Sequence, residues 1–321
     1  MATDDIQLKK GYEILNKIKS FLGDNIELYL VGGSVRDLLL DKTPKDYDFT
    51  TPLLPDTIED LVKKAGRHPY IIGKKYGTIG FKFEGYFIEI TTFRNEEYLS
   101  TSRRPRVEFV NTLEEDLSRR DFTINAIALS SQAVIDPFNG IKDIESGIIR
   151  AAGDADTRIG EDPLRILRMI RFVSTLGYDV DESLLQACQK KASSIKIVSR
   201  ERIAVELDKI IMGKNCKQAL EIMAKLDLMP YTLPLLSLQA NATSKKAWDE
   251  TINAVVNASY EDNIRWASLL KNISQPFIGR EIDNDLTERL VRMVAFDLKW
   301  SKTKTNAIVE ETCDLATLSQ S

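Results

Sequence analysis

The pattern of hydrophobic and polar residues changes once along the chain, between about residues 145 and 160. In the part before this change, short runs rich in β-branched and aromatic residues alternate with helical segments, which favours a mixture of strands and helices. The predicted strands are 26–31, 46–50, 78–83 and 86–93, and the segment 55–65, with a proline near its start, predicts a helix.

After residue 160 the strand signals stop, and apolar residues recur with the period of amphipathic helices. Helices are predicted at 163–176, 182–192, 199–212 and 216–225, and helical periodicity continues across 244–316. The fold class is therefore predicted to be α+β, with a head that contains a mixed β-sheet followed by an all-α remainder. A length of 321 residues suggests two or three domains.

Composition excludes several classes of function. The net charge of −4 argues against binding nucleic acid through an overall positive charge, although Lys and Arg side chains can still gather on one face. The single histidine, His68, excludes a metal site or a phosphohydrolase site built from several histidines. No apolar run is long enough to cross a membrane, and the N-terminus lacks the layout of a secretory signal, so we expect no membrane partner.

The cysteine count points to a cellular compartment. Cys188, Cys216 and Cys313 lie far apart in the sequence, fit no metal-binding spacing and cannot all form disulfides. We therefore expect reduced thiols in a cytoplasmic protein.

Two adjacent glycines mark the first candidate site. Gly32 and Gly33 follow a predicted strand and begin a helical segment that contains Arg36. Such a corner lets backbone N–H groups approach a phosphate closely, although tight turns also use glycine for conformational reasons alone. We treat Gly32, Gly33 and Arg36 as candidate nucleotide-binding residues.

Paired carboxylates follow in the next predicted strand. Because side chains alternate along a strand, Asp46 and Asp48 lie on one face, where they repel each other unless a cation lies between them. Two Mg²⁺ ions could use both carboxylates, one to activate an attacking 3′-hydroxyl and the other to stabilise a triphosphate leaving group. Glu89, inside an otherwise apolar strand, is a candidate third carboxylate, or else belongs to the polar face of a half-exposed strand.

Two arginines near the end of the head match a polyanionic ligand. The guanidinium groups of Arg119 and Arg120 can each bind phosphate oxygens in a fork, so they are candidates to bind a triphosphate. Asp121 and Asn125 follow closely, and they either contact a ribose or brace the arginines.

A third group opens the predicted helix at 163–176. Asp162 precedes a proline and can cap the helix, and Arg165 shares its face. Cytosine and adenine both offer an exocyclic amine to a carboxylate and a ring nitrogen to an arginine, whereas uracil and guanine present a carbonyl to the carboxylate. Asp162 and Arg165 are therefore predicted to select C and A, and Arg168 continues the basic spacing. The charged run at 199–207 predicts a capped helix start that either braces this helix or forms a salt-bridged surface.

Six motifs in this order resemble a known family. They read GGSVRDLLLDKTPKDYDFTT, IEITTFR, RRDFTINAIA, DPFNGIKDIESGIIR, GEDPLRILRMIRF and SRERIAVEL, within about residues 26–235. They resemble the class II tRNA nucleotidyltransferases, which are CCA-adding enzymes, and their relatives the bacterial poly(A) polymerases.

The resemblance implies a domain organisation and a set of site residues. It implies a nucleotidyltransferase head at 1–145, a helical neck with the base-recognition motif at 146–212, and a helical body with a shortened tail that binds tRNA at 213–321. It implies that Asp46 and Asp48 bind metal, that Asp121 and the adjacent arginines lie at the nucleotide site, and that Asp162 and Arg165 act as a protein template.

The implied activity is addition of C and A from CTP and ATP to the 3′ end of tRNA, with release of pyrophosphate. A poly(A) polymerase, an enzyme that adds only CC or only A, and an inactive RNA-binding relative remain alternatives. The segment 94–106 lies where the family has a flexible loop, so we expect a mobile segment that governs the switch from C to A. The sequence leaves the oligomeric state open.

Overall fold

The structure is a computed structural model that describes residues 8–97, 106–241, 245–278 and 283–318, and it forms two compact units, Met1–Glu161 and Asp162–Ser321. The predicted head lies within the first unit, and the expected α+β head and all-α remainder are confirmed. No helix among the described residues is long and apolar enough to cross a membrane.

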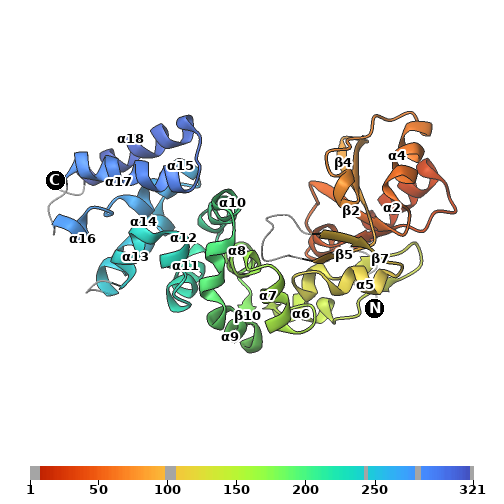
Figure 1. Ribbon diagram of the computed structural model, residues 1–321, viewed down its shortest axis with the longest axis horizontal. Coiled ribbons are helices and arrows are strands. Elements are labelled where there is room, and N and C mark those ends of the chain that lie inside the picture. Colours follow the sequence, from red (N-terminus) through yellow and green to blue (C-terminus); the bar gives the residue numbers. More distant parts are fainter. Residues whose placement is uncertain (1–7, 98–105, 242–244, 279–282, 319–321) are drawn as a thin grey trace. The chain divides into compact units, whose positions relative to one another are not determined.

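A mixed sheet forms the centre of the first unit. Within the described residues it has six strands in the order β3-β4-β2-β1-β7-β8. These are β1 (Tyr29–Val31), β2 (Asp46–Thr51), β3 (Thr78–Phe83), β4 (Tyr86–Thr92), β7 (Ala128–Leu129) and β8 (Val134–Ile135). Strands β2 and β4 pair in parallel, side by side in Figure 1, and the other pairs are antiparallel. The strands predicted from the sequence are all present, and β1 is shorter than expected.

Helices and short strands surround this sheet. The helices are α2 (Lys9–Leu22), α3 (Gly33–Leu39), α4 (Pro55–Lys64), α5 (Leu113–Ser118), α6 (Gly140–Ser146) and α7 (Ala155–Glu161), with 3₁₀ turns η1 (Lys74–Tyr76) and η2 (Thr123–Asn125). A short strand, β9 (Ile148–Ile149), follows α6. In α2, which was not predicted, Ile14, Leu15, Ile18 and Leu22 are buried at helical spacing.

A two-stranded ribbon corrects part of the prediction for the segment 94–106. Strands β5 (Arg94–Glu97) and β6 (Arg106–Phe109) pair antiparallel, so both ends of the expected loop have regular structure. Residues 98–105 lie outside the described residues. The prediction of a segment without regular structure is therefore wrong for 94–97 and untested for its centre.

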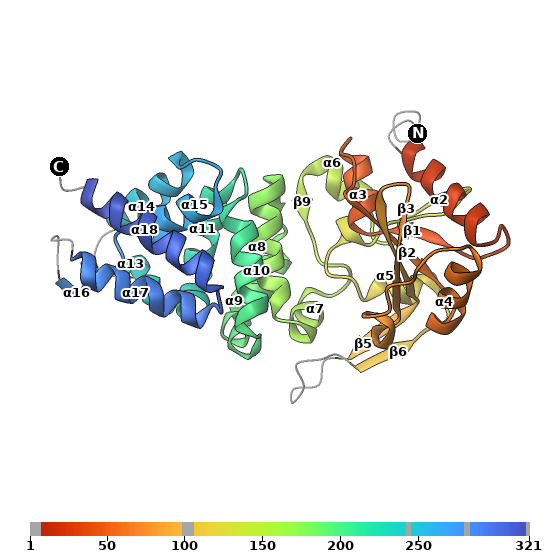
Figure 2. The same cartoon turned by 90° about the horizontal axis from the view of Figure 1, so that it is seen from above.

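The second unit is helical. Its helices are α8 (Leu164–Leu176), α9 (Glu182–Lys190), α10 (Arg200–Ile211), α11 (Cys216–Lys225), α12 (Met229–Thr232), α13 (Pro234–Asn241), α14 (Lys245–Asn257), α15 (Asp262–Leu270), α16 (Gln275–Ile278), α17 (Asn284–Asp297) and α18 (Lys302–Leu318), with a 3₁₀ turn η3 (Ala192–Ile197). Helix α8 packs against α10 and α11, and Figure 2 shows α8 and α10 side by side. One short strand, β10 (Asp179–Val180), lies where none was predicted.

The burial of α8 explains its central place in this unit. Most of its apolar side chains are buried, including those on successive turns such as Ile166, Ile170 and Val173. A helix that is apolar around most of its circumference must be covered on several sides. The polar residues at its beginning are therefore held close to the core of the second unit.

Candidate functional site

Three carboxylates meet on the strands β2 and β4. Asp46 and Asp48 alternate with buried Tyr47 and therefore point to the opposite face of the sheet from that ring. The parallel register places Asp48 beside Glu89. Asp46 is exposed, whereas Asp48 and Glu89 are half-buried. The structure thus brings together the three acidic residues predicted from the sequence.

Repulsion between these carboxylates contributes to raised pKa values of Asp48 and Glu89. Burial, with a further contribution from Asp46, raises the pKa of Asp48 above its ordinary value, although Arg120 and Arg36 oppose the rise. Burial, followed by the charges of Asp48 and Asp46, likewise raises the pKa of Glu89. Groups that raise one another's pKa bind a cation favourably, because a positive charge removes the repulsion.

This donor set fits an open magnesium site. Among the described residues, no three acidic, cysteine or histidine side chains gather closely enough to enclose a metal ion by themselves. Mg²⁺ usually keeps several waters and is held by one or two carboxylates together with substrate phosphates, so it does not need such an enclosure. The hard carboxylate oxygens of Asp46 and Asp48 match this preference.

The glycine corner lies next to these carboxylates. Gly32 has a φ of 69°, in the left-handed region, and the position that a Cβ atom would take is 2.8 Å from Nη1 of Arg120. Any side chain here would displace that guanidinium and strain the backbone. The next residues tie the corner to β2, since Ser34 Oγ accepts from the Asp48 amide at 3.0 Å and donates to the Asp46 carbonyl at 3.3 Å.

Arg36 is held by a chain of side chains. Its Nη1 donates to the side-chain oxygen of Asn125 at 2.6 Å, and the Asn125 amide donates to Asp121 at 2.9 Å. Asp121 also accepts from the backbone of Phe122. Of the two roles left open for Asp121 and Asn125, the structure supports bracing: their side chains brace Arg36, and the Asn125 carbonyl also accepts from Nη1 of Arg120 at 3.5 Å. Contact with a ribose stays a prediction.

Arg119 and Arg120 share a partner that the sequence analysis did not identify. Asp116, which is fully buried, accepts from Nε and Nη2 of Arg119 at 3.0 and 2.8 Å and from Nη2 of Arg120 at 3.1 Å. Burial by itself would raise the pKa of Asp116, but the two arginines outweigh it and hold that pKa below its ordinary value. The charge of Arg120 also acts on Asp48, so the arginines and the carboxylates belong to one site.

The predicted base-selecting pair lies in the second unit. Asp162 and Arg165 are both buried, and Asp162 accepts from the Leu164 amide at 3.1 Å and from Nη2 of Arg202 at 2.8 Å. The helix begins at Leu164, so Pro163 takes the cap position instead of the first helical position that was expected. Asp162 nevertheless supports the helix start through the Leu164 amide. Each carboxylate oxygen accepts up to two hydrogen bonds, so Asp162 keeps capacity for a base.

The charged run at 199–207 braces α8, which is the first of the two interpretations given for it. Besides the bond from Arg202 to Asp162, Arg171 pairs with the buried Glu206 at 3.1 Å. Ser199 occupies the cap position of α10, but its side chain makes no capping bond, so the predicted cap is wrong in this detail. Arg168 is half-buried on α8, and its predicted contact with nucleotide is untested.

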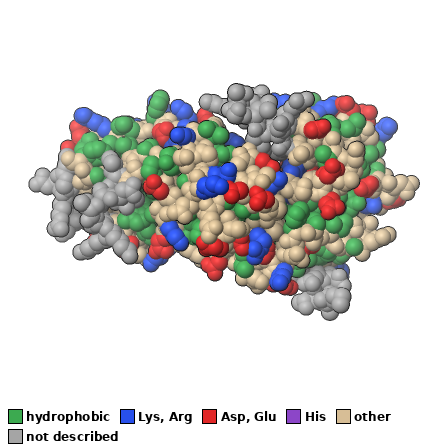
Figure 3. Space-filling model, turned by 60° about the horizontal axis from the view of Figure 1, so that its bottom comes forward, with side chains coloured by type: hydrophobic (Ala, Val, Ile, Leu, Met, Phe, Trp, Pro, Cys, Tyr) green, Lys and Arg blue, Asp and Glu red, His purple; other side chains and the backbone are tan. Residues whose placement is uncertain are grey.

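On the face shown in Figure 3, basic and acidic side chains are interspersed. At both candidate sites arginines pair with buried carboxylates: Arg119 and Arg120 with Asp116, and Arg202 with Asp162.

Comparison with known proteins shows which family this chain resembles over most of its length. Residues 28–150 match the family described as the poly A polymerase head domain. Residues 177–239 match the family described as a probable RNA and SrmB-binding site of polymerase A. The CCA-adding enzyme of Staphylococcus aureus (strain Newman) is 36% identical over 303 residues, which cover 90% of this chain and 74% of that enzyme. The chain belongs to the family of CCA-adding enzymes.

Other members of the family agree. The CCA-adding enzyme of Staphylococcus epidermidis is 42% identical over 220 residues, a match that spans 68% of this chain and about half the length, 53%, of that enzyme. A crystal structure of the Bacillus stearothermophilus CCA-adding enzyme in complex with CTP is 28% identical and superposes with a TM-score of 0.70 over 98% of this chain and 78% of that one.

The sequence analysis missed the contacts through which three residues hold the candidate site residues in place. Ser34, Asp116 and Arg202 each hold a predicted residue in place from a distance of 14 to 40 residues or through a local helix turn. Ser34 and Arg202 belong to motifs that the sequence analysis recognised, but the sequence did not show which residues they contact. Asp116 stood in an acidic helical run and gave no signal of burial.

Proposed function

We propose that this chain adds C and A nucleotides to the 3′ end of tRNA, using CTP and ATP and releasing pyrophosphate. The observation that supports this most strongly is the meeting of Asp46, Asp48 and Glu89 beside the paired arginines, in a member of the CCA-adding family. Negative groups that favour a cation and positive groups that favour a polyphosphate are what nucleotidyl transfer requires.

In the proposed reaction, the 3′-oxygen of the RNA forms a bond to the α-phosphorus of the nucleotide. The bond from that phosphorus to the bridging oxygen of the β-phosphate breaks, pyrophosphate leaves and the hydroxyl proton passes to water. We assign Arg36, Arg119 and Arg120 to bind the triphosphate, with Gly32 and Gly33 allowing its close approach. Such residues contribute by holding the reacting atoms in line and by stabilising the charge on the leaving group.

Asp46 and Asp48 would hold Mg²⁺, and Glu89 would support them from the neighbouring strand. When bound, the metal ions supply activation of the attacking hydroxyl and charge stabilisation for the leaving pyrophosphate. The half-buried positions of Asp48 and Glu89 keep these carboxylates partly shielded from water, which strengthens their attraction for a cation.

We further propose that Asp162 and Arg165 select the base. The carboxylate accepts the exocyclic amine of C or A, and the guanidinium donates to the adjacent ring nitrogen. Against U or G, the carboxylate faces a carbonyl oxygen, and two desolvated acceptors opposed in this way cost about 1–3 kcal/mol. The bond from Arg202 fixes the Asp162 carboxylate in one orientation, which such a test of the base requires.

These assignments give each part of the chain a separate function. We propose that residues 1–145 form the catalytic head, that 146–212 act as the neck with Asp162, Arg165 and Arg168, and that 213–321 form a helical body and tail that binds tRNA. The centre of the segment 94–106 is proposed to govern the change from C to A. A cytoplasmic location also stays a prediction.

The proposal is tested with tRNA that lacks its 3′-terminal CCA. The full chain is incubated with CTP, ATP, UTP or GTP one at a time, with Mg²⁺ or with a chelator, and the products are sequenced. We expect two C residues from CTP, no addition from UTP or GTP, and no addition after chelation. Repeated addition from ATP alone to any RNA would indicate a poly(A) polymerase, and no addition from any nucleotide would indicate an inactive RNA-binding relative.

A further inference from the structure

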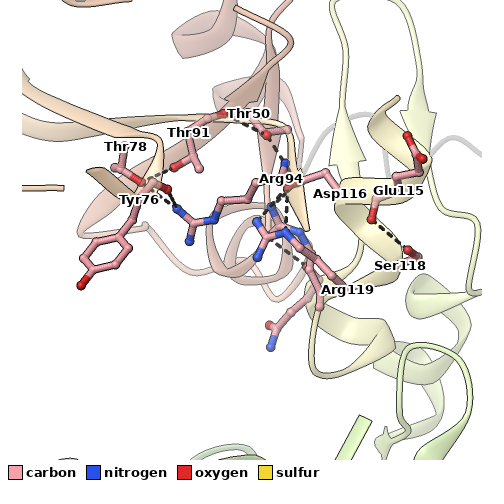
Figure 4. A network of polar contacts seen from close by, with 11 residues as sticks. Thr50, Tyr76, Thr78, Thr91, Arg94, Glu115, Asp116, Ser118 and Arg119 are labelled. Atoms are coloured by element: carbon pink, nitrogen blue, oxygen red, sulfur yellow. Dashed lines mark hydrogen bonds and ion pairs between the residues drawn. The ribbon is translucent and has the colours of Figure 1, made fainter. Parts of the chain in front are cut away.

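One buried carboxylate connects the two arginines of the nucleotide site to the root of the β5–β6 ribbon. Asp116 is 0% exposed and lies on α5. Its Oδ1 accepts from Arg119, as described above, and from the backbone amide of Arg94 at 3.3 Å. Figure 4 shows the Arg119 side chain at this carboxylate, whereas the Arg94 side chain points away from it, toward Tyr76 and Thr78.

The second oxygen of Asp116 is equally occupied. Oδ2 accepts from Nη2 of Arg120 at 3.1 Å and from Oγ1 of Thr50 at 3.3 Å. Thr50 lies on β2, two residues after Asp48. A single side chain therefore receives donors from β2, from the first residue of β5 and from both arginines.

The buried carboxylate of Asp116 is stable in its ionised form only while it stays paired with its donors. An ionised carboxylate removed from water strongly destabilises a protein unless charged partners and hydrogen bonds replace its hydration. The Arg119 and Arg120 side chains are 14% and 17% exposed, so they are themselves largely withdrawn from water. The three groups leave one net positive charge beside the carboxylates on β2, and this charge is available to a triphosphate.

The position of Arg120 depends on Asp116 on one side and on the glycine corner on the other. Its Nη1 fills the space that a Cβ atom at Gly32 would need, and its Nη2 donates to Asp116. Without these contacts the guanidinium would leave this position, because fixing an arginine side chain costs rotamer entropy.

We propose that Asp116 is a positioning residue for nucleotide binding: it fixes Arg119 and Arg120 toward the triphosphate and joins the root of β5 to them. This inference deepens the proposed function and rests on it. Asp116 touches no substrate atom in this proposal, and its effect on catalysis passes through the arginines.

The test uses Asp116→Asn in the full chain, with Glu114→Gln as the matched control. Both changes remove one negative charge from α5, but the Glu114 side chain is exposed, whereas that of Asp116 is buried. We expect Asp116→Asn to raise the KM for CTP by about tenfold or more, the loss expected when charge-assisted hydrogen bonds are no longer oriented. The KM for tRNA and the kinetics of the control should stay close to those of the parent.

A second measurement identifies the part of the nucleotide that is affected. Inorganic tripolyphosphate should compete with CTP in the parent, and its inhibition constant should rise in Asp116→Asn by a factor similar to that of the KM for CTP. If instead kcat falls while the KM for CTP and the inhibition by tripolyphosphate are unchanged, Asp116 has only a structural role and the inference is overturned. Equal rises in the KM values for CTP and tRNA would overturn it as well.

A variant at Thr50 keeps the inference testable if Asp116→Asn does not fold. Thr50→Val leaves the charges in place and removes the hydroxyl, which donates to Asp116 Oδ2 at 3.3 Å and to the Thr91 carbonyl at 3.1 Å. It should raise the KM for CTP severalfold without changing that for tRNA. An unchanged KM for CTP would contradict the inference. Failure of the proposed function is recognised separately, because the parent itself would then add no nucleotide to tRNA.

Discussion

The carboxylates of the two candidate sites have opposite kinds of neighbours. On β2 and β4, Asp48 and Glu89 lie beside other acidic groups, and burial together with this repulsion raises their pKa values. At the start of α8, Asp162 accepts from a backbone amide and from Arg202.

The carboxylates on β2 and β4 therefore need the charge of a bound cation to balance their repulsion, whereas the hydrogen bonds of Asp162 are already formed within the protein. Acidic groups that repel one another destabilise the folded protein until a cation binds, and such conflicts are found where function requires them. A carboxylate whose hydrogen bonds are satisfied stabilises its surroundings and presents a fixed surface. Substitutions of Asp46 or Asp48 should therefore change activity without lowering stability, whereas those at Asp162 should change both.

The largest expected effect comes from the first site. Asp46→Asn or Asp48→Asn should lower nucleotide addition by roughly three orders of magnitude or more, because each removes a charge that holds Mg²⁺. Binding of tRNA, measured by gel shift or fluorescence anisotropy, should match that of the parent. Appreciable turnover by both variants in Mg²⁺ would contradict the assignment of Asp46 and Asp48 as metal ligands.

The second site should show itself in selectivity. In Asp162→Ala, discrimination against UTP and GTP should fall by about ten- to a hundredfold, since the acceptor that opposes their carbonyl groups is gone. Use of CTP and ATP should also fall, and stability should drop by about 1–2 kcal/mol through loss of the bonds to the Leu164 amide and Arg202. Incorporation is measured with all four nucleotides on tRNA ending before CCA and on tRNA ending in CC, together with thermal unfolding.

Two control variants sharpen this prediction. Arg165→Ala should mainly weaken the use of CTP and ATP, because their ring nitrogen accepts from the guanidinium. It should also relax selectivity in part, because the corresponding ring nitrogen of uracil or guanine carries a proton and opposes that donor. Arg202→Ala keeps Asp162 but removes its brace, so it should relax selectivity less than Asp162→Ala. If folded Asp162→Ala rejects UTP and GTP as strictly as the parent, Asp162 only supports the helix start.

A moderate effect is expected from the segment between β5 and β6. Shortening 98–105 while keeping both strands should leave CC addition near the parent rate and lower addition of the terminal A by about ten- to a hundredfold, since small displacements of a substrate have effects of this size. The rates of the two steps are compared on tRNA with and without CC. Equal loss of both steps would indicate that this segment only supports folding.

The smallest effect is on stability and has an opposite sign at the two sites. The folded pKa of Asp48 lies above its ordinary value of 3.8, so its ionised form is penalised at neutral pH and the penalty fades as the pH falls through the folded pKa. Asp48→Asn should therefore unfold at a higher temperature than the parent at pH 7, and the gain should shrink toward pH 4. Thermal unfolding curves across this range that show a lower melting temperature at pH 7 would contradict the proposed repulsion.

What the sequence could predict depended on whether the partners of a residue were local. The strand that carries Asp46 and Asp48 was predicted correctly, because alternation along the strand already places both on one face. Their proximity to Glu89 depends on parallel pairing of β2 with β4, and no local pattern sets that register.

Other features depend on contacts that sequence periodicity does not encode. The acidic run around Asp116 resembles a solvated helix turn, and its burial follows only from Thr50 on β2 and Arg94 on β5. Strands β7 and β10 have two residues each, too few to show alternation. Helix α2, in contrast, carried an amphipathic pattern that could have been recognised.

The most direct test of the proposed function is the end point of the reaction with CTP and ATP supplied together in excess. The parent chain is incubated for a long time with tRNA that lacks CCA, and the added nucleotides are sequenced. We predict that most products carry C, C and A in that order and then no further nucleotide. A long tail of A residues, or tRNA that remains unextended, would contradict the proposal.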